Sequence, residues 1–273
     1  MSDTDLNPQS RQMADESMVR TLDAQITLIW PQEIEILRRY GLHGPIRILD
    51  AGCGTGAASE RLAELFPDAT ILGVDIVDEH LDLASHRCAR FGPRVRFGHE
   101  TLFALDEPNG WFDLTVCRHV IHSIPHAERV VAELARVTRP GGRVHVIAED
   151  YHMLHFQRGA LDPSDFWHEG PVRFGEATGT DLLIGRRIVP IFQALGLTEI
   201  RLDYVVVDTL RTPREVFAAM MVAWRDGYVD PIAEHTQFSR EQATAYFNQM
   251  IEDIRNPARY ALWLVPVASA RVP

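Results

Sequence analysis

Short apolar runs alternate with amphipathic segments through the middle of the chain. Between residues 45 and 150, the stretches that separate these runs have apolar positions at helical spacing. The pattern predicts strands at 46–50, 69–75, 95–98, 114–117 and 143–148, and helices at 57–66, 78–91 and 126–138. Strands that alternate with helices in this way form a parallel sheet with helices on both faces.

The regions before residue 45 and after residue 150 show a different pattern of apolar and polar positions. Residues 1–17 are polar and acidic, so we expect a disordered tail, and helical spacing predicts an N-terminal helical cap at 18–44 that Pro31 divides into two short helices. A segment rich in aromatic residues, histidine, glycine and proline, 151–178, is expected to be an irregular cover. Beyond it the pattern predicts a helix at 181–195, a strand at 199–207, helices at 212–228 and 239–254, and a last strand at 260–267.

These elements divide the chain into parts. After the tail and the cap we expect a core at 45–210, which includes the cover, then a helical lid inserted at 211–258. The final strand, within 259–273, returns to the core. A helical hairpin placed before a closing strand is suited to shaping a substrate pocket.

Composition narrows the class of protein and its partners. The 273 residues carry a net charge of −11, which disfavours a nucleic-acid partner because like charges repel. No apolar run reaches the ~18 residues needed to cross a bilayer, and the polar start shows no secretory signal. Three cysteines without metal-type spacing suit a reducing compartment, so we expect a cytoplasmic protein without a membrane partner. All 27 basic residues are arginine, which excludes lysine-dependent chemistry.

The first expected strand ends in an acid and enters a glycine-rich loop. Asp50 closes the strand, and Gly52, Gly54 and Gly56 follow at every second position. Glycine has no Cβ, so such a loop can take tight backbone angles and let a ligand approach its amides. A second acid, Asp75, ends the next strand. A strand, a glycine loop, a helix and a second strand ending in an acid describe a nucleoside-binding unit.

Two nucleoside cofactors fit this unit. The loop loosely matches the dinucleotide fingerprint G-x-G-x-x-G/A, but residues 50–56 more closely resemble motif I of class I S-adenosylmethionine (SAM) dependent methyltransferases, (D/E)-x-G-x-G-x-G. SAM carries an ammonium that needs a carboxylate, whereas a pyrophosphate would be repelled by one. Asp50 therefore favours SAM over NAD. Asp75 suits either cofactor, since both offer ribose hydroxyls.

Two further segments resemble the small-molecule members of this family. Residues 112–116 are similar to its fourth strand, and Arg-Pro-Gly-Gly at 139–142 is similar to its turn before strand five. The resemblance implies an α/β fold with a doubly wound, mostly parallel, seven-stranded Rossmann-like sheet whose last strand is antiparallel. SAM would be the cofactor, S-adenosyl-L-homocysteine (SAH) its product, and a small molecule the substrate. A homodimer is compatible with the sequence, which does not fix the oligomeric state.

The resemblance also implies roles at the carboxyl ends of the strands, where open parallel sheets bind ligands. Asp50 and the backbone of the glycine loop would face the methionine end of SAM, and Asp75 would face the ribose. Glu100 and Thr101 would lie near the adenine, although the family often has aspartate where Glu100 stands. Arg118 would line the methionine side, largely through its backbone.

Histidines follow the fourth expected strand, where a base would assist methyl transfer to oxygen. The alternatives are histidines that only line the pocket or support the structure, and a transfer that uses no base. We rank His122 ahead of His119 as the catalytic base, because histidine takes up protons near neutral pH and the segment around His122 partly resembles the Leu-His-Asp-Trp-Pro-Asp segment of O-methyltransferases. The neighbouring Asp-Trp of that segment is missing here. No compact set of acidic ligands stands out, so no metal is expected.

We therefore expect a SAM-dependent methyltransferase that acts on a small, partly apolar molecule, at oxygen. One alternative is an NAD-dependent oxidoreductase, which preferential binding of NAD would reveal. The other alternative is a protein that binds SAM and catalyses a reaction other than methylation. Retained SAM binding with no transfer to any acceptor would favour the latter.

Overall fold

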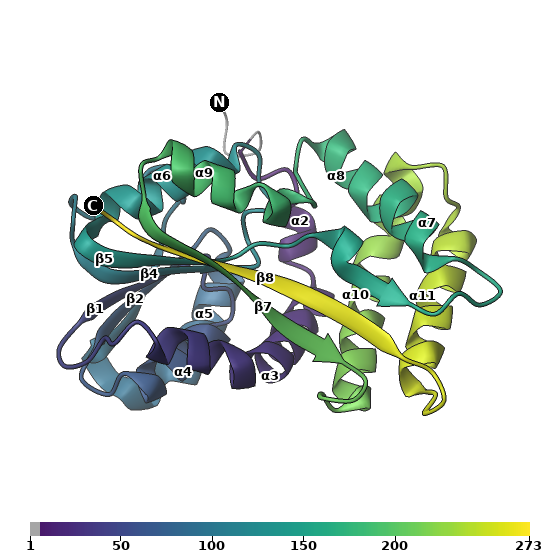
Figure 1. The fold of residues 1–273 in the computed structure, drawn as a ribbon, viewed down its shortest axis with the longest axis horizontal. Coiled ribbons are helices and arrows are strands. Elements are labelled where there is room, and N and C mark those ends of the chain that lie inside the picture. Colours follow the sequence, from purple (N-terminus) through teal and green to yellow (C-terminus); the bar gives the residue numbers. More distant parts are fainter. Residues whose placement is uncertain (1–5) are drawn as a thin grey trace.

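The computed structural model describes residues 6–273 as a sheet flanked by helices, with a helical region beyond one end of the parallel strands (Figure 1). The strands are β1 (Arg47–Ala51), β2 (Thr70–Asp75), β3 (Val95–His99), β4 (Phe112–Arg118), β5 (Thr138–Ile147), β6 (Leu154–Phe156), β7 (Thr198–Asp208) and β8 (Ala261–Arg271). They form one eight-stranded sheet in the order β3-β2-β1-β4-β5-β8-β6, and β7 also pairs with β8.

The strand directions confirm the predicted doubly wound, mostly parallel α/β fold. The neighbours among β1 to β5 pair in parallel, and β8 pairs antiparallel with β5, β6 and β7. Of the described strands, only β8 therefore runs against the others. The sheet has eight strands rather than seven, because the short β6 pairs with the start of β8. β1 lies between β2 and β4, so the strand order reverses at β1.

Helices cover both faces of the sheet. The helices are α2 (Ser10–Met13), α3 (Glu16–Arg38), α4 (Ala57–Leu65), α5 (Asp78–Cys88), α6 (Ala127–Val137), α7 (Pro163–Trp167), α8 (Arg173–Thr178), α9 (Ile188–Ala194), α10 (Arg214–His235) and α11 (Arg240–Arg255). One face packs against α4, α5 and the end of α3, and the other packs against α6 and α9 (Figure 1). The hairpin of α10 and α11 lies beside α7 and α8, and its role as a lid stays a prediction.

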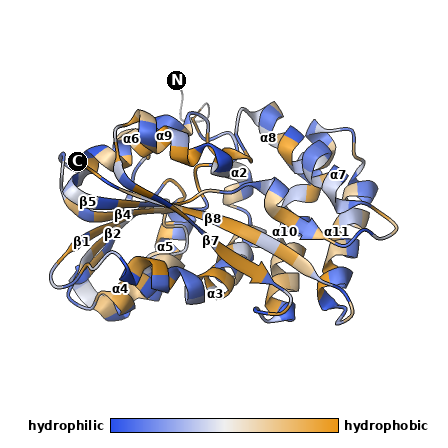
Figure 2. Ribbon diagram, viewed as in Figure 1, coloured by the Kyte–Doolittle hydropathy of each residue, from blue (hydrophilic) through white to orange (hydrophobic). Residues whose placement is uncertain are grey.

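β8 connects two hydrophobic cores. Its last residues pair with β5 in the parallel sheet, while its first residues pair with β6. Trp263 is fully buried in the core that includes α10 and α11, whereas Ala268 and Ala270 belong to the core under α6 and α9. Figure 2 shows hydrophobic residues along β7 and β8 where these strands approach α10. One long strand thus joins the sheet to the helical region.

The expected disordered tail is wrong for the residues that the structure describes, while 1–5 lie outside them. The Asp15 carboxylate caps α3 by accepting a hydrogen bond of 2.9 Å from the Ser17 amide. Gln9 is 1% exposed, and its Nε2 donates to Thr180 Oγ1 at 2.9 Å. The polar residues of this segment make caps and long-range hydrogen bonds, which a prediction from composition cannot foresee.

α3 is one helix of 23 residues, although the sequence predicts a break at Pro31. Proline removes one backbone hydrogen bond from a helix interior. The next residue, Gln32, is bound to β7: its side-chain amide donates to Val206 O at 2.8 Å and accepts from Val206 N at 3.1 Å. Leu28 and Ile29 are buried in the core one turn earlier. These tertiary contacts outweigh the local preference for a break.

The segment 151–178 is mostly helical rather than irregular. Asp162 caps α7 by accepting from the Ser164 amide at 3.1 Å, and Pro163 occupies the first turn, where its missing N–H is not needed. A π-helical turn, His168–Val172, joins α7 to α8. Trp167 packs its ring against aromatic side chains of α10 and α11. The aromatic and glycine content therefore reflects close packing of short helices.

Candidate functional site

The loop between β1 and α4 is held closely against its neighbours. The Gly52 amide donates to Val74 O at 2.8 Å, which fixes the loop to the end of β2. Gly52, Gly54 and Gly56 have φ angles of 73°, 51° and 74°, in the left-handed region that favours glycine. A Cβ at Gly52 would lie 2.4 Å from Val120 Cγ2, so the close approach of the loop after β4 requires glycine there.

Asp75 ends β2 beside this loop and is anchored by three backbone amides. One carboxylate oxygen accepts from Gly54 N at 2.8 Å, and the other accepts from Ile76 N at 2.8 Å and Val77 N at 3.1 Å. The carboxylate is half-buried. A carboxylate has about two acceptor sites on each oxygen, so the Asp75 oxygen that accepts from Gly54 N keeps capacity for a ligand hydroxyl.

Asp50 lies deeper, at the end of β1. It is 1% exposed and accepts a hydrogen bond from Ser59 Oγ at 2.6 Å. Burial raises the pKa of Asp50 to about 6, and the Ser59 hydrogen bond only partly opposes this rise. Asp50 lines a small recess beside a larger pocket. The residues that line both cavities are Leu22, Gly52, Arg118 and His119.

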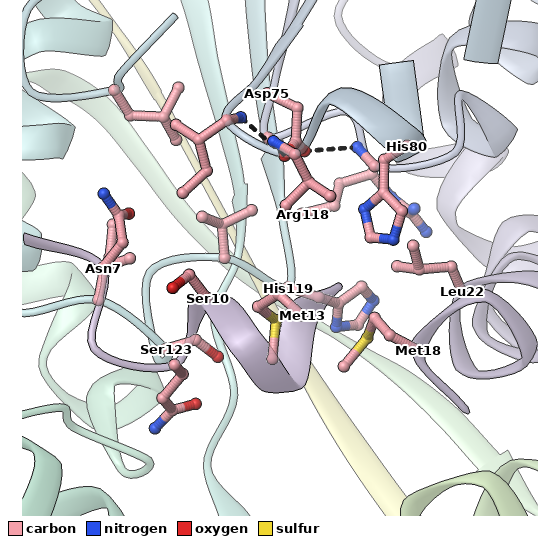
Figure 3. Close-up of a pocket in the computed structure, with 18 of the residues that line it drawn as sticks. Asn7, Ser10, Met13, Met18, Leu22, Asp75, His80, Arg118, His119 and Ser123 are labelled. Carbon is pink, nitrogen blue, oxygen red and sulfur yellow. Dashed lines mark hydrogen bonds between the residues drawn. The ribbon is translucent and has the colours of Figure 1, made fainter. Parts of the chain in front are cut away.

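The larger pocket lies at the carboxyl ends of β1, β2 and β4, where the strand order reverses (Figure 3). Open parallel sheets bind ligands at this point. The N-terminal segment closes one side of it. The lining residues are Asn7, Gln9, Ser10, Met13, Met18, Leu22, Gly52, Gly54, Asp75, Ile76, Val77, His80, Glu100, Leu102, Phe103, Arg118, His119, Val120, Ser123 and Ile124.

Most of the site residues predicted from the sequence meet here. Those that line the pocket are Gly52, Gly54, Asp75, Glu100, Arg118 and His119. Thr101 lies in an adjoining depression that Glu100 shares, and burial raises the pKa of Glu100. Gly56 is not among the lining residues: it is the N-cap of α4, where a Cβ would lie 2.7 Å from that of Ala84.

The Arg118 side chain is bound to α3 rather than free to meet a ligand. Its Nε donates to the two Glu33 oxygens at 2.9 and 3.1 Å, and its Nη2 donates to one of them at 2.9 Å. Glu33 is fully buried and also contacts His145 Nε2 at 3.1 Å, while Tyr40 bonds the other nitrogen of that ring. Burial raises the pKa of Glu33, but Arg118 and His145 outweigh it and lower the pKa to about 2.

His119 follows β4 and forms a buried pair with Glu149. Its φ of 57° is uncommon for a residue other than glycine, and backbone strain of this kind clusters at functional sites. Its Nδ1 hydrogen-bonds the Glu149 carboxylate, and its Nε2 is buried without a partner. Burial raises the pKa of Glu149, but the interaction with His119 outweighs it and holds this pKa below its ordinary value. The pair can accept a proton at Nε2.

His122 is not among the residues that line the pocket. The loop turns after His119, with Ser123 N donating to Val120 O at 2.9 Å, and the His122 ring meets the edge of Tyr151 at 6.0 Å between centroids. Burial lowers the pKa of His122 to about 4, so this ring is neutral near pH 7. The geometry therefore favours His119 over His122, the reverse of the order taken from the sequence.

Several residues at the site escaped the sequence analysis. His80 and Ser123 line the pocket, and His80 Nε2 and Ser123 Oγ are buried without hydrogen-bond partners. Position offers a signal for both, since His80 lies in the first turn of the helix after Asp75 and Ser123 in the loop after β4. Met13 and Met18 also line the pocket, and no feature of the sequence pointed to these two methionines as part of the site.

The residues present fit SAM. Asp75 offers acceptors to ribose hydroxyls, Asp50 offers a carboxylate to an ammonium, and the unpaired Nε2 of His80 lies on the Asp75 side of the pocket (Figure 3). Among residues 6–273, no group of three or more histidine, cysteine, aspartate or glutamate side chains could hold a metal ion. Within the same range no helix combines the length and hydrophobicity that a membrane span requires.

Comparisons with known sequences agree with this fit. Residues 48–142 match the family model described as a methyltransferase domain. The ubiquinone biosynthesis O-methyltransferase of Methylococcus capsulatus is 34% identical over 168 residues, which covers 56% of this chain and 70% of that protein. Other curated relatives are matched over less of their length, in one case 25%.

Solved structures share the fold. Phosphoethanolamine N-methyltransferase 2 of Haemonchus contortus, solved with SAH, has a TM-score of 0.58 and 20% identity, over 89% of this chain and 53% of that chain. The [4+2]-cyclase SpnF has a TM-score of 0.56 and 17% identity, over 88% of this chain and 80% of that chain. At these identities the likeness concerns the fold alone. Together with the M. capsulatus relative and the strand-end pocket, the family model leads to one conclusion: this chain belongs to the class I SAM-dependent methyltransferases.

Proposed function

We propose that this methyltransferase acts on a hydroxyl oxygen of a small, partly apolar molecule, with His119 as the general base. One observation carries the proposal: in the pocket that fits SAM, His119 has one ring nitrogen bonded to a buried carboxylate and the other without a partner. A histidine held in this way is suited to removing a proton from an acceptor.

The chain's own residues would bind and orient the two reactants. Asp75 and His80 would hold the ribose side of SAM, Asp50 its ammonium, and the amides of the glycine loop would approach it closely. When bound, SAM supplies a methyl group already activated by its sulfonium. The protein therefore has to align the acceptor and take up its proton, and alignment alone is worth ~7–11 kcal/mol in well-oriented cases.

The His119–Glu149 pair would take up the hydroxyl proton of the acceptor. As the acceptor oxygen gains the methyl group, its hydroxyl proton passes to His119 Nε2. Glu149 keeps the proton of Nδ1 in place and stabilises the imidazolium that forms. His119 is 9% exposed and Glu149 is 1% exposed, so water competes little for either group and their interaction is stronger than in solvent.

Methyl transfer from labelled SAM to a panel of small phenols and alcohols tests the proposal. We expect His119→Asn to lower turnover about 10²–10⁴-fold and to leave SAH affinity unchanged. The matched control is His122→Asn, also at a buried histidine, which should keep most of the turnover. Equal turnover of the His119 variant and the wild type would contradict the role of His119. SAH binding with no transfer to any acceptor would favour a reaction other than methylation.

We also place the protein in the cytoplasm, because its three cysteines are unpaired, buried thiols, which suits a reducing compartment. The absence of a nucleic-acid partner and the homodimer stay predictions.

A further inference from the structure

One wall of the pocket lies apart from Asp75 and His80, and its member His119 also lines the recess beside Asp50. This wall consists of Met13, Met18, His119, Ser123 and Ile124, which we call the acceptor wall. In Figure 3 the labelled members of this wall lie on the opposite side of the view from Asp75 and His80. Two methionines and an isoleucine make this surface mainly apolar, and methionine adapts to ligands of varied shape.

Two polar atoms of the acceptor wall have no partner in the protein. They are His119 Nε2 and Ser123 Oγ, and both are buried. Ser123 is 4% exposed, so bulk water reaches its hydroxyl poorly. Buried polar groups are nearly always hydrogen-bonded, so these two atoms are placed to bond a molecule in the pocket that carries two hydrogen-bonding groups. One group would meet the base and the other would meet Ser123.

The charges around the acceptor wall are unfavourable to an anion. Of the described side chains that line the pocket, the one arginine is Arg118, and its guanidinium is already bonded to the buried Glu33. The chain has no lysine that could take its place. Glu149 adds a buried negative charge on the far side of His119. A carboxylate or phosphate placed here would lose its hydration without gaining a counter-charge.

We infer that the acceptor wall takes a hydroxyl compound with a second hydrogen-bonding group and no anionic group, and that Ser123 is a specificity-determining residue. This inference rests on the proposed function, because it treats the partner of His119 Nε2 as the methyl acceptor. The apolar body of the acceptor packs on Met13, Met18 and Ile124. Its reacting hydroxyl donates to His119, and its second group bonds the Ser123 hydroxyl.

Calorimetric binding of matched phenols to the SAH-loaded full-length protein tests the inference. The probes are catechol, phenol, and the catechol ring bearing a carboxylate opposite the hydroxyls. We expect catechol to bind at least about tenfold more tightly than its carboxylate partner. Ser123→Ala should weaken catechol about two- to tenfold, the worth of one neutral hydrogen bond, and leave phenol and SAH unaffected. The control variant is Ser85→Ala, at an exposed serine of α5.

Each outcome separates this inference from the function on which it rests. Equal or tighter binding of the carboxylate partner would overturn the exclusion of anions. Unchanged catechol binding by the Ser123 variant, or no binding of catechol at all to the SAH-loaded protein, would overturn the assignment of the acceptor wall. Methyl transfer that depends on His119 would survive either result, whereas failure of the wild type to bind SAH would remove the proposed function itself.

Discussion

The two sides of the pocket are built in different ways. The cofactor side is built mainly from one strand-loop-helix-strand unit, β1 to β2, with His80 from the helix that follows. Much of its chemistry is backbone, namely left-handed glycines and amides that anchor Asp75. The acceptor wall takes side chains from the N-terminal segment and from the loop after β4, and Glu149 supports it from the end of β5. The first side is specified locally, whereas the second exists only once the chain has folded.

The buried Glu33–Arg118 pair connects α3 to the end of β4 beside the pocket, and breaking it should have the largest effect. Glu33→Gln leaves the Arg118 charge buried without a full partner, so we expect the free energy of unfolding to fall by about 3–5 kcal/mol in chemical denaturation. The matched control is Glu35→Gln, which removes an exposed pair with Arg38 on the same helix and should cost at most about 1 kcal/mol. Equal losses in the two variants would show that α3 is not held by the buried pair.

Alanine substitutions at two glycines, one in the cofactor loop and one in an open turn, test how strictly each backbone position requires glycine. Gly41 and Gly52 both have positive φ, but an added Cβ meets nothing within 4 Å at Gly41 and would lie 2.4 Å from Val120 at Gly52. Gly41→Ala should lose about 1–2 kcal/mol of unfolding free energy, for the left-handed backbone alone. Gly52→Ala should lose more and should also weaken SAH binding in calorimetry. Equal stability losses in the two variants, with unchanged SAH affinity, would show that the close contact between Gly52 and Val120 contributes neither to stability nor to binding.

The pH dependence of SAH affinity tests the carboxylate beneath the loop. The pKa of Asp50 is raised to about 6 in the free protein, and the ligand's ammonium favours the ionised form, so protonation opposes binding below that pH. We expect SAH to bind about tenfold more weakly near pH 5 than near pH 7, because one proton must then leave. Asp50→Asn should bind weakly with a flat profile over the same range. A wild-type affinity that rises on acidification would contradict the role of Asp50.

The sequence predicted the parallel half of the fold well. Apolar runs bounded by acids and glycines placed β1 and β2 close to their observed limits, because most of their residues are buried in the sheet. The edge strand β3 was also placed close to its limits, although it is largely half-buried or exposed. The sequence analysis missed β6, which is only three residues long. It also missed the helices of 151–178, although Asp162 and Pro163 form a recognisable start of α7. The helix through Pro31 depends on contacts with β7, which no local pattern reveals.

Site residues likewise divide into those that a local motif reveals and those that only tertiary contacts bring together. Asp50, Asp75 and the glycines could be found because one contiguous motif carries them. The choice between His119 and His122 could not be made, since it depends on a turn of the loop after β4 and on Glu149, 30 residues away in the sequence. Methionines of the N-terminal segment reach the pocket only through the placement of α2 and α3. Residues that act through tertiary contacts leave little trace in a single sequence.

Calorimetric titration with SAH, with NAD titrated in parallel, tests the central claim that the strand-end pocket binds SAM through Asp75. We expect the wild type to bind SAH and not NAD. Asp75→Asn should bind SAH about ten- to hundredfold more weakly, because it loses hydrogen bonds to a charged acceptor. The control Asp78→Asn, at an exposed aspartate of α5, should bind SAH as the wild type does. Binding of NAD in preference to SAH, or equal SAH affinity in the Asp75 variant, would contradict the account.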